Sequence, residues 1–377
     1  MPAGLAVGSL ERPSPWQAAR GYVLVFDRTL LLAIGLLAVI SVATMLSAAF
    51  DYPSRQVGHL RNLALAFGVI WAAALVPPVM LMRLALPLYA LSLALLVAVE
   101  VFGVTAKGAT RWLDLGITRI QPSEMAKIAT PLMLAWYFNQ REGVLRWHDY
   151  AAATVLLALP VGLIAKQPDL GTSILVLSAG AYVIFFAGLS WKVIGGLAVG
   201  ALASMPLLWS VMHEYQRQRV LTLLDPTADP LGRGFHIIQS TIAVGSGGLT
   251  GKGWMQGTQT HLEFIPERTT DFILAVYAEE FGLVGVSVLM LLYLAVISRG
   301  LVIAGSGATL FGRLMAGSIT MSFLTYCFVN MGMVIGMLPV VGVPLPWMSY
   351  GGTAMVTLGL GTGILMSIHR HRTPGPS

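Results

Sequence analysis

Long apolar runs recur along the whole chain, and they restrict the fold more than any other feature of the sequence. A helix that crosses a bilayer needs roughly 20 mostly apolar residues, and ten segments come close to this length. Only 11% of the residues are charged, whereas a soluble domain carries about 25%. We therefore predict an all-α polytopic membrane protein with one long extracytoplasmic loop. The expected spans are 28–49, 60–81, 83–103, 122–140, 150–166, 170–189, 191–212, 271–299, 309–335 and 350–368.

Lysine and arginine residues indicate how these spans are oriented, because cytoplasmic loops carry an excess of both. If the N-terminus is cytoplasmic, the inner set is Arg12, Arg20, Arg28, Arg83, Arg141, Arg146, Lys192, Arg299, Arg313, Arg370 and Arg372. The short outer loops then contain Arg55, Arg61, Lys107, Arg111, Arg119 and Lys166. The larger inner set predicts that both termini are cytoplasmic. These Lys and Arg residues also account for the net charge of +6, so the charge does not indicate a nucleic-acid partner.

The chain is predicted to form a single membrane domain with one unusually long connection. We divide it into a cytoplasmic N-terminal segment (1–27), helices 1–7 (28–212), the long extracytoplasmic loop (213–270), helices 8–10 (271–368) and a cytoplasmic tail (369–377). Within the first group of helices, residues 104–121 are too polar to span and are expected to form an amphipathic outer loop. Loops longer than about 15 residues are often functional, so we expect function in the long loop.

Charged residues gather where the long loop meets the eighth span, in the sequence EFIPERTTD. Asp271 is predicted to lie in the first turn of that helix, with Thr270 as its N-cap. The helix dipole stabilises an acidic residue at this position, so the position alone does not require a function. However, Glu263, Glu267 and Arg268 accompany it at the membrane surface, and charge near the bilayer often marks a functional site. This cluster is therefore a candidate site.

A second charged cluster opens the fourth span. Glu124 and Lys127 are three residues apart, so they share one helix face and could form an ion pair. Within a membrane each charge alone costs about 2.5–3.5 kcal/mol on the insertion scale. Two interpretations remain open: a neutral pair that fixes helix packing, or the lining of a polar cavity that receives the charged part of a substrate.

The glycine-rich sequence GSGGLTGKG resembles a nucleotide-binding loop, but its spacing is wrong. A P-loop ending at Lys252 would need glycine at position 246 and Ser or Thr at position 253. The chain has Ser246 and Gly253 instead. The segment is either a flexible loop in which Lys252 can meet a phosphate, or a simple bend.

Other polar residues have structural interpretations, and for some of them a functional one is also open. Asp169 could be only a cap for the sixth span, after a tight hairpin at QPDLG. Glu279 and Glu280, within the eighth span, could line a cavity or be buried and hydrogen-bonded. The uncharged segment 343–353 is rich in Pro and Gly, so we predict irregular backbone that is buried or lines a cavity, since lipid does not tolerate exposed irregular backbone.

Several motifs, in order, resemble the SEDS family (shape, elongation, division and sporulation). They are KGATRWLDLG, QPSEMAKI, QPDLGTSIL, YQRQRV, LLDP, DPLGRGFHIIQS, GSGGLTGKGW, EFIPERTTDFILAV and PVVGVPLPWMSYGG, and they extend from about residue 25 to residue 370. Arg268 resembles the rod-shape branch more than the division branch, where Ala is usual. One residue departs from the pattern: Thr269 stands where the rod-shape branch commonly has His.

The resemblance implies a ten-span peptidoglycan glycosyltransferase of the bacterial inner membrane. Its substrate would be lipid II, and its partners would be a class B penicillin-binding protein with transpeptidase activity and other membrane proteins of the elongation machinery. The family's essential acidic residue maps onto Asp271. An α-linked sugar pyrophosphate that becomes a β-1,4 glycan is displaced with inversion. This reaction needs a base for the acceptor hydroxyl and stabilisation of the leaving pyrophosphate.

We assign the base to Asp271 and the pyrophosphate contacts to Arg111, Lys127 and Lys252. Glu124, Glu267 and Arg268 complete the predicted substrate-binding set. No sequence pattern demands a metal ion, although a divalent cation (Mg²⁺ or Mn²⁺) near Asp271 is compatible with the chemistry.

Two other function classes fit parts of the sequence. A lipid II flippase would use intramembrane charges and broken helices, but it needs polar groups through the whole membrane, and here they gather in the outer third. A scaffold for cell-wall synthases would not depend on any single carboxylate. For the polymerase we expect a lipid-facing groove with an apolar lower wall. It would rise to Arg111, Glu124, Lys127 and Asp271.

Overall fold

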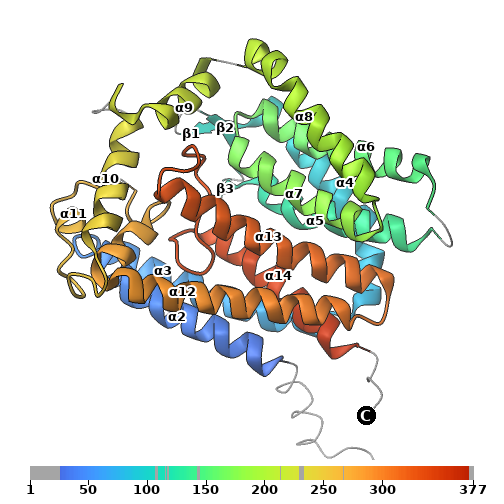
Figure 1. Ribbon diagram of the computed structural model, residues 1–377. Helices are drawn as coiled ribbons and strands as arrows, with labels where there is room; N and C mark the ends of the chain where they lie inside the picture. The colour runs from blue at the N-terminus through green and yellow to red at the C-terminus, as the bar shows by residue number, and fades with distance from the viewer. Residues whose placement is uncertain are drawn as a thin grey trace, which may run out of the picture.

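The computed structural model describes residues 26–106, 109–114, 116, 119–141, 145–212, 214–228, 233–265 and 267–372. Its helices form one bundle, and the segments between α8 and α12 gather at one end of it (Figure 1). The elements are α2 (Arg28–Ala48), α3 (Pro53–Leu75), α4 (Pro78–Phe102), β1 (Val104–Ala106), β2 (Ala109–Asp114), β3 (Arg119–Ile120), α5 (Pro122–Asn139), α6 (Trp147–Lys166), α7 (Leu170–Phe186), α8 (Trp191–Val211), α9 (Glu214–Leu224), the 3-10 turn η1 (Pro226–Ala228), α10 (Arg233–Ser246), α11 (Thr258–His261), α12 (Ile273–Gly305), α13 (Leu310–Val334) and α14 (Gly352–Arg370).

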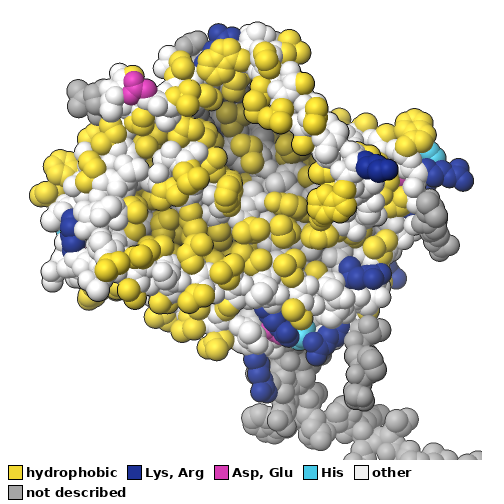
Figure 2. Space-filling view, viewed as in Figure 1, with side chains coloured by type: hydrophobic (Ala, Val, Ile, Leu, Met, Phe, Trp, Pro, Cys, Tyr) yellow, Lys and Arg dark blue, Asp and Glu magenta, His cyan; other side chains and the backbone are white. Residues whose placement is uncertain are grey.

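The prediction of an all-α polytopic membrane protein is confirmed. Each predicted span corresponds to a helix in the described part of the chain, namely α2 to α8 and α12 to α14. Within that part, seven helices have the length and apolar composition to cross a membrane: α2, α3, α4, α6, α12, α13 and α14. Hydrophobic side chains cover the middle of the face seen in Figure 2, as expected for a surface that meets lipid.

The predicted boundaries of the second and third spans were wrong. The second helix runs from Pro53 to Leu75 rather than over 60–81, and the third begins at Pro78 rather than at 83. Pro77 is the N-cap of α4 and Pro78 occupies its first turn. Proline has no N–H group, and the first turn of a helix needs none. The Pro-Pro pair therefore starts a helix here instead of interrupting one.

Close helix contacts are made through small residues. A Cβ atom at Gly359 on α14 would lie 2.8 Å from the carbonyl oxygen of Ala66 on α3, and one at Gly363 would lie 2.7 Å from that of Ile70. Without a hydrophobic effect between helices in lipid, such close backbone approach supplies the packing energy. By contrast, α8 lies at the edge of the bundle, and its described side chains are half or fully exposed.

The outer loop at 104–121 forms a small antiparallel sheet in the described residues. β2 lies between β1 and β3, with Val104 opposite Trp112 and Leu113 opposite Ile120. The sheet brings Arg111 over the hairpin between α6 and α7, where its Nη2 donates to the carbonyl oxygen of Pro168 at 2.6 Å. This loop therefore has regular structure of its own.

The long outer loop is docked into a break in α12. Gly282 has φ 62° and ψ −163°, which interrupts the helix. Lys252 N and Gly253 N donate to the carbonyl oxygens of Glu279 and Glu280, both at 3.0 Å. In return, the amides of residues 283 and 284 donate to the carbonyl oxygens of residues 248 and 249 at 2.9 and 3.0 Å. The loop thus satisfies the backbone groups that the break sets free, as membrane interiors require.

Gly251 should be intolerant of a side chain, because it has φ +80° and its Cβ would lie 2.1 Å from the carbonyl oxygen of Glu280. We expect Gly251→Ala to lower the free energy of unfolding by about 2 kcal/mol or more. Thermal unfolding in detergent and limited proteolysis of the outer loop measure this. The matched control is Gly245→Ala, whose Cβ meets nothing within 4 Å. An unchanged midpoint for Gly251→Ala would contradict the docking.

The start of α2 and the end of α14 lie at the end of the bundle that is opposite the segments between α8 and α12 (Figure 1). Asp27 caps α2 by accepting from Leu30 N at 2.8 Å. It also pairs with Arg299 of α12, with Nη2 to Oδ2 at 2.5 Å, and lies 3.3 Å from His369 of α14. Burial raises the pKa of Asp27, but the hydrogen bonds from Arg299 and Leu30 N outweigh it and hold the pKa below its usual value. This cluster joins the first and last described helices on one side.

Candidate functional site

Asp271 lies just before α12 and not in its first turn. The helix begins at Ile273 with Phe272 as N-cap, and among the described residues no side chain caps it. The predicted N-cap, Thr270, instead donates its hydroxyl to the Oε2 atom of Glu267 at 3.1 Å. The N-cap prediction was therefore wrong, because the residues before Asp271 form a turn that is held by other parts of the protein.

Three donors from other elements fix the backbone that carries Asp271. They are Tyr350 N to the oxygen of Thr269 at 2.8 Å, Ser349 Oγ to that of Thr270 at 2.6 Å, and Asn330 Nδ2 to that of Asp271 at 2.8 Å. Tyr350 and Ser349 belong to the segment 343–353, which was predicted to be irregular and buried. That prediction is confirmed, since residues 345 and 347–349 are almost inaccessible. The segment is a rigid support for the site.

Arg268 anchors the same turn to the corner between α2 and α3. Its Nε donates to the oxygen of Ala48 at 2.8 Å, it pairs with Asp51, and its guanidinium lies 5.1 Å from the centre of the Phe50 ring. Burial raises the pKa of Asp51, but its hydrogen bonds, that from Arg268 first, together with the charge of Arg268 outweigh burial, so the pKa is lowered. Arg268 thus anchors the turn and is not among the residues that line the Asp271 cavity, while its predicted contact with substrate stays a prediction.

Thr269, the departure from the family pattern, is fully buried. Its hydroxyl accepts a hydrogen bond from Arg55 Nη1 at 2.9 Å. Arg55 lies on α3, so this bond ties the turn to a second helix. The residue that replaces the family's histidine is therefore part of the anchoring of the Asp271 turn.

Asp271 and Glu267 line one cavity of about 170 Å³. The other lining residues are Thr222, His236, Ile237, Phe272 and Val340. Glu267 has a left-handed backbone with φ 52°, a conformation that is costly for a non-glycine residue and tends to occur at functional sites. The predicted association of Glu267 with Asp271 thus has a geometric basis. α9 and α10, both from the long loop, supply Thr222 and His236.

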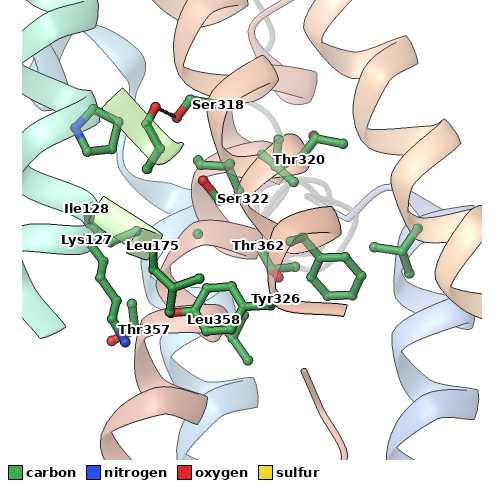
Figure 3. A pocket seen from close by; sticks show the side chains of 17 residues that line it. Lys127, Ile128, Leu175, Ser318, Thr320, Ser322, Tyr326, Thr357, Leu358 and Thr362 are labelled. Carbon is green, nitrogen blue, oxygen red and sulfur yellow. Dashed lines mark hydrogen bonds between the residues drawn. The ribbon is translucent and has the colours of Figure 1, made fainter. Parts of the chain in front are cut away.

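Glu124 and Lys127 form a buried ion pair, with Nζ 2.6 Å from Oε1 and 7% and 13% of the Lys and Glu side chains exposed. Thr357 on α14 donates to Glu124 Oε2 at 3.1 Å, and Lys127 Nζ lies 5.4 Å from the centre of the Tyr326 ring. Figure 3 shows Lys127 reaching toward Thr357 beside a cavity of about 50 Å³ between α5, α13 and α14. Its walls are mostly apolar, with hydroxyl groups such as that of Ser322.

The two centres are attached to a single helix. Tyr326, beside Lys127, and Asn330, beside Asp271, are four residues apart on α13, which is about 6 Å along the helix axis. Lys127 and Asp271 nevertheless line separate cavities. The single groove that would join Lys127 to Asp271 therefore stays a prediction.

The other predicted cationic residues have protein partners. Arg111 Nη1 lies 3.8 Å from Asp169 Oδ1. Asp169 also caps α7 by accepting from Thr172 N at 3.2 Å, which confirms the cap interpretation. About 30% of the Arg111 side chain stays exposed, so it remains accessible to a ligand.

Lys252 belongs to the α12 break. Its Nζ lies 2.7 Å from Glu279 Oε1 and donates to Thr258 at 2.7 Å, while Glu279 is completely buried. Glu280 accepts from Ser47. The buried, hydrogen-bonded interpretation of the two glutamates is thus correct. Lys252 is a partner of this cluster, and its predicted role as a pyrophosphate ligand stays a prediction.

We expect Glu124 and Lys127 to behave as a coupled pair. Glu124→Gln or Lys127→Gln alone should lower stability by about 2.5–3.5 kcal/mol, since each leaves one charge without its partner inside the membrane. The double variant should recover the stability but polymerise poorly, because the cavity loses its charges. Thermal unfolding and glycan synthesis are measured on the same preparations. A fully active double variant would show that the pair only packs the helices.

Sequence reasoning missed several residues of the site. His236 and Thr222 come from the long loop, Asn330 is a lone amide within an apolar run, and Ser349 lies in an uncharged segment. Of these residues, only Asn330 could have been noticed in the sequence, because a polar side chain within a membrane span needs a partner and often marks a functional site. Among the described residues, no group of three or more His, Cys, Asp or Glu side chains is arranged to hold a metal ion.

Relatives are known for nearly the whole chain. A family model described as "Cell cycle protein" (FTSW_RODA_SPOVE) matches residues 22–374. The chain is 52% identical over 347 residues to the peptidoglycan glycosyltransferase MrdB of Escherichia coli K12, covering 92% of this chain and 94% of the relative. It is 37% identical over 282 residues to the probable peptidoglycan glycosyltransferase FtsW of Geobacter metallireducens, covering 74% of each.

Solved structures share the fold. A chain from a peptidoglycan synthase complex, described for its structural coordination of polymerization and crosslinking, superposes with a TM-score of 0.81 at 35% identity. The match covers 93% of this chain and 99% of that one. RodA of Thermus thermophilus superposes with a TM-score of 0.71 at 30% identity, again over 93% of this chain and 99% of the other.

Proposed function

This chain belongs to the FtsW/RodA/SpoVE family, and from that membership we propose that it joins lipid II disaccharides into β-1,4 glycan strands for cell elongation and rod shape. It is a peptidoglycan glycosyltransferase, the activity for which its relatives are named. The observation that carries the proposed mechanism is the turn before α12, where three hydrogen bonds from α13 and the segment before α14 hold Asp271 at a cavity wall.

The proposed reaction is a single displacement at the anomeric carbon of a lipid-linked donor. The 4-hydroxyl of the acceptor attacks this carbon, the bond to the pyrophosphate breaks, and the configuration inverts. Asp271 accepts a hydrogen bond from the attacking hydroxyl and directs it. Fixing the backbone on both sides of a carboxylate favours this role, because orientation of the reactants lowers the barrier without any movement during the reaction.

The leaving pyrophosphate needs cationic partners near headgroup level. We propose Lys127 and Arg111 as these partners, since both lie at the end of the bundle that carries the Asp271 turn. Each cation already has a carboxylate partner, Glu124 for Lys127 and Asp169 for Arg111. In the complex, each cation would be shared between its carboxylate and a phosphate. The apolar walls of the Lys127 cavity suit the start of a polyprenyl chain. A divalent cation such as Mg²⁺ or Mn²⁺ at the pyrophosphate remains part of the proposal to be tested.

The proposal includes the orientation of the protein in the membrane and its protein partner. We propose that the ends joined by Asp27, Arg299 and His369 face the cytoplasm of a bacterial cell and that the Asp271 end faces outward from the inner membrane. A solved structure of a peptidoglycan synthase complex contains a chain of the same fold. It supports a class B penicillin-binding protein as the partner that crosslinks the product, within the elongation machinery.

The decisive experiment is glycan synthesis from purified lipid II. The protein is reconstituted with its class B partner, whose transpeptidase site is blocked, with no other glycosyltransferase present. We expect long glycan strands on a gel, and their absence would contradict polymerase activity. Transport of labelled lipid II across vesicles without any polymer would instead favour the flippase.

A further inference from the structure

His236 lies in the Asp271 cavity and has no role in the mechanism above. It belongs to α10 and lines the cavity together with Glu267 and Asp271. Its ring stacks on that of Phe272, with centroids 5.6 Å apart and 27° between the ring planes. Since Phe272 follows Asp271 directly, the stacking holds the imidazole next to the turn that carries the carboxylate.

One nitrogen of this ring has no partner in the protein. Nδ1 of His236 is buried and makes no hydrogen bond to the described residues. Nearly all buried polar atoms in proteins are hydrogen-bonded, and an exception calls for an explanation such as a catalytic role. A neutral imidazole has one donor and one acceptor nitrogen. Because Nδ1 has almost no accessible surface, a hydroxyl in the cavity would meet the ring at Nε2, which is not one of the buried unpaired atoms.

The helix that carries His236 is well anchored. Ser240, one turn further along α10, donates its hydroxyl to the oxygen of Val334 at the end of α13 at 2.9 Å. Ile237 is buried beside it. α10 is thus fixed to the same helix, α13, whose Asn330 holds the backbone of Asp271. The imidazole and the carboxylate therefore share one support.

The surroundings keep the imidazole neutral. Burial lowers the pKa of His236 below its usual value, and the charge of Glu267 only partly opposes this shift. The ionisable groups that line the cavity with it are Glu267 and Asp271. α9 contributes Thr222 and the segment after α13 contributes Val340, and neither side chain ionises. At neutral pH the ring can therefore accept a proton.

We propose that His236 is a second catalytic residue, which receives the proton of the acceptor hydroxyl while Asp271 orients that hydroxyl. The inference rests on the proposed function and deepens it. The hydroxyl oxygen bonds to the anomeric carbon as the bond from that carbon to the pyrophosphate oxygen breaks. The electron pair of the broken bond leaves with the pyrophosphate, and the proton passes to the acceptor nitrogen of His236. Glu267 and Asp271 stabilise the imidazolium, which afterwards returns its proton to water.

His236→Gln tests this role, because glutamine keeps a polar side chain but does not take up a proton. We expect kcat for glycan synthesis from lipid II to fall by about 10²-fold or more, with little change in KM. His148→Gln, at a half-exposed histidine on α6, is the matched control and should behave like the wild type. A His236→Gln enzyme with wild-type kcat would overturn the proposal.

The pH profile separates catalysis from positioning. The wild-type rate should fall as the pH drops through the pKa of His236, which burial places below the usual value of about 6.5. Protonated His236 can no longer accept a proton, and His236→Gln should lack this limb. A slow variant that keeps the limb would show that His236 only positions the turn. If His236→Gln fails to fold, the wild-type profile decides, and a flat rate from pH 7 to pH 5 overturns the proposal. A wild-type protein that makes no polymer at any pH would instead refute the proposed function itself.

Discussion

Replacing Asp271 with asparagine is expected to abolish glycan synthesis, with a loss of about 10³-fold or more, within the range that a positioned acid or base contributes. The substitution keeps the size of the side chain but removes its charge, so the amide cannot attract the proton of the acceptor hydroxyl. Membrane insertion and partner binding should persist, because the hydrogen bonds to the backbone carbonyl oxygens of Thr269, Thr270 and Asp271 do not depend on the charge of the side chain. Polymer yield from purified lipid II is the measurement.

Asp114→Asn is the matched control for this experiment. Asp114 is an exposed outer carboxylate of β2 that accepts from Gly116 N at 2.9 Å and pairs with Arg119 at 3.2 Å. Its loss should leave the polymer yield unchanged. Near-normal polymer from Asp271→Asn, with the same thermal midpoint as the wild type, would remove Asp271 from the mechanism.

Replacing Lys252 with methionine should produce the largest loss of stability. Glu279 is completely buried, and the substitution leaves its charge without its cationic partner. Breaking a buried ion pair from one side costs about 3–5 kcal/mol. The outer loop should detach from the α12 break, which would lower the thermal midpoint and expose the loop to proteases. Lys166→Met is the control, since that side chain is 72% exposed and an exposed pair contributes little.

The double variant Lys252→Met with Glu279→Gln decides what Lys252 does. We expect it to regain most of the lost stability, because neither group is then a buried unpaired charge. If Lys252 only holds the loop, glycan synthesis returns with stability. A stable double variant that remains inactive would support the sequence-based interpretation of Lys252 as a pyrophosphate ligand.

The membrane spans could be predicted because a bilayer requires long apolar helices, and the main errors occurred at their ends. Two prolines in sequence start a helix at Pro78, although in the sequence alone they look like an interruption. Asp271 and its neighbour Glu267 could also be predicted, because their motif is local in sequence. The N-cap of α12 could not be predicted, since the turn takes its shape from donors in α13 and the segment before α14.

The roles of the charged residues depended on partners far away in sequence. Arg268 pairs with Asp51 and Lys252 with Glu279, and no periodicity or spacing links these positions. The anchoring contacts of these two cations could therefore not be predicted from the sequence, and their predicted contacts with the substrate stay predictions. His236 was missed for a related reason, since nothing distinguishes it from the other two histidines of the long loop until that loop is folded against Phe272.

The exposure of α8 has a consequence for how the site responds to its surroundings. The 21 residues of α8 extend about 32 Å, close to the roughly 30 Å thickness of a hydrocarbon core. Because few protein contacts restrain its described side chains, the tilt of α8 is set largely by the match between its length and the lipid. α8 is followed by α9, which supplies Thr222 to the wall of the Asp271 cavity. We therefore expect a change in bilayer thickness to act on the cavity through α8 and α9, so that the lipid composition of the membrane influences the activity of the enzyme.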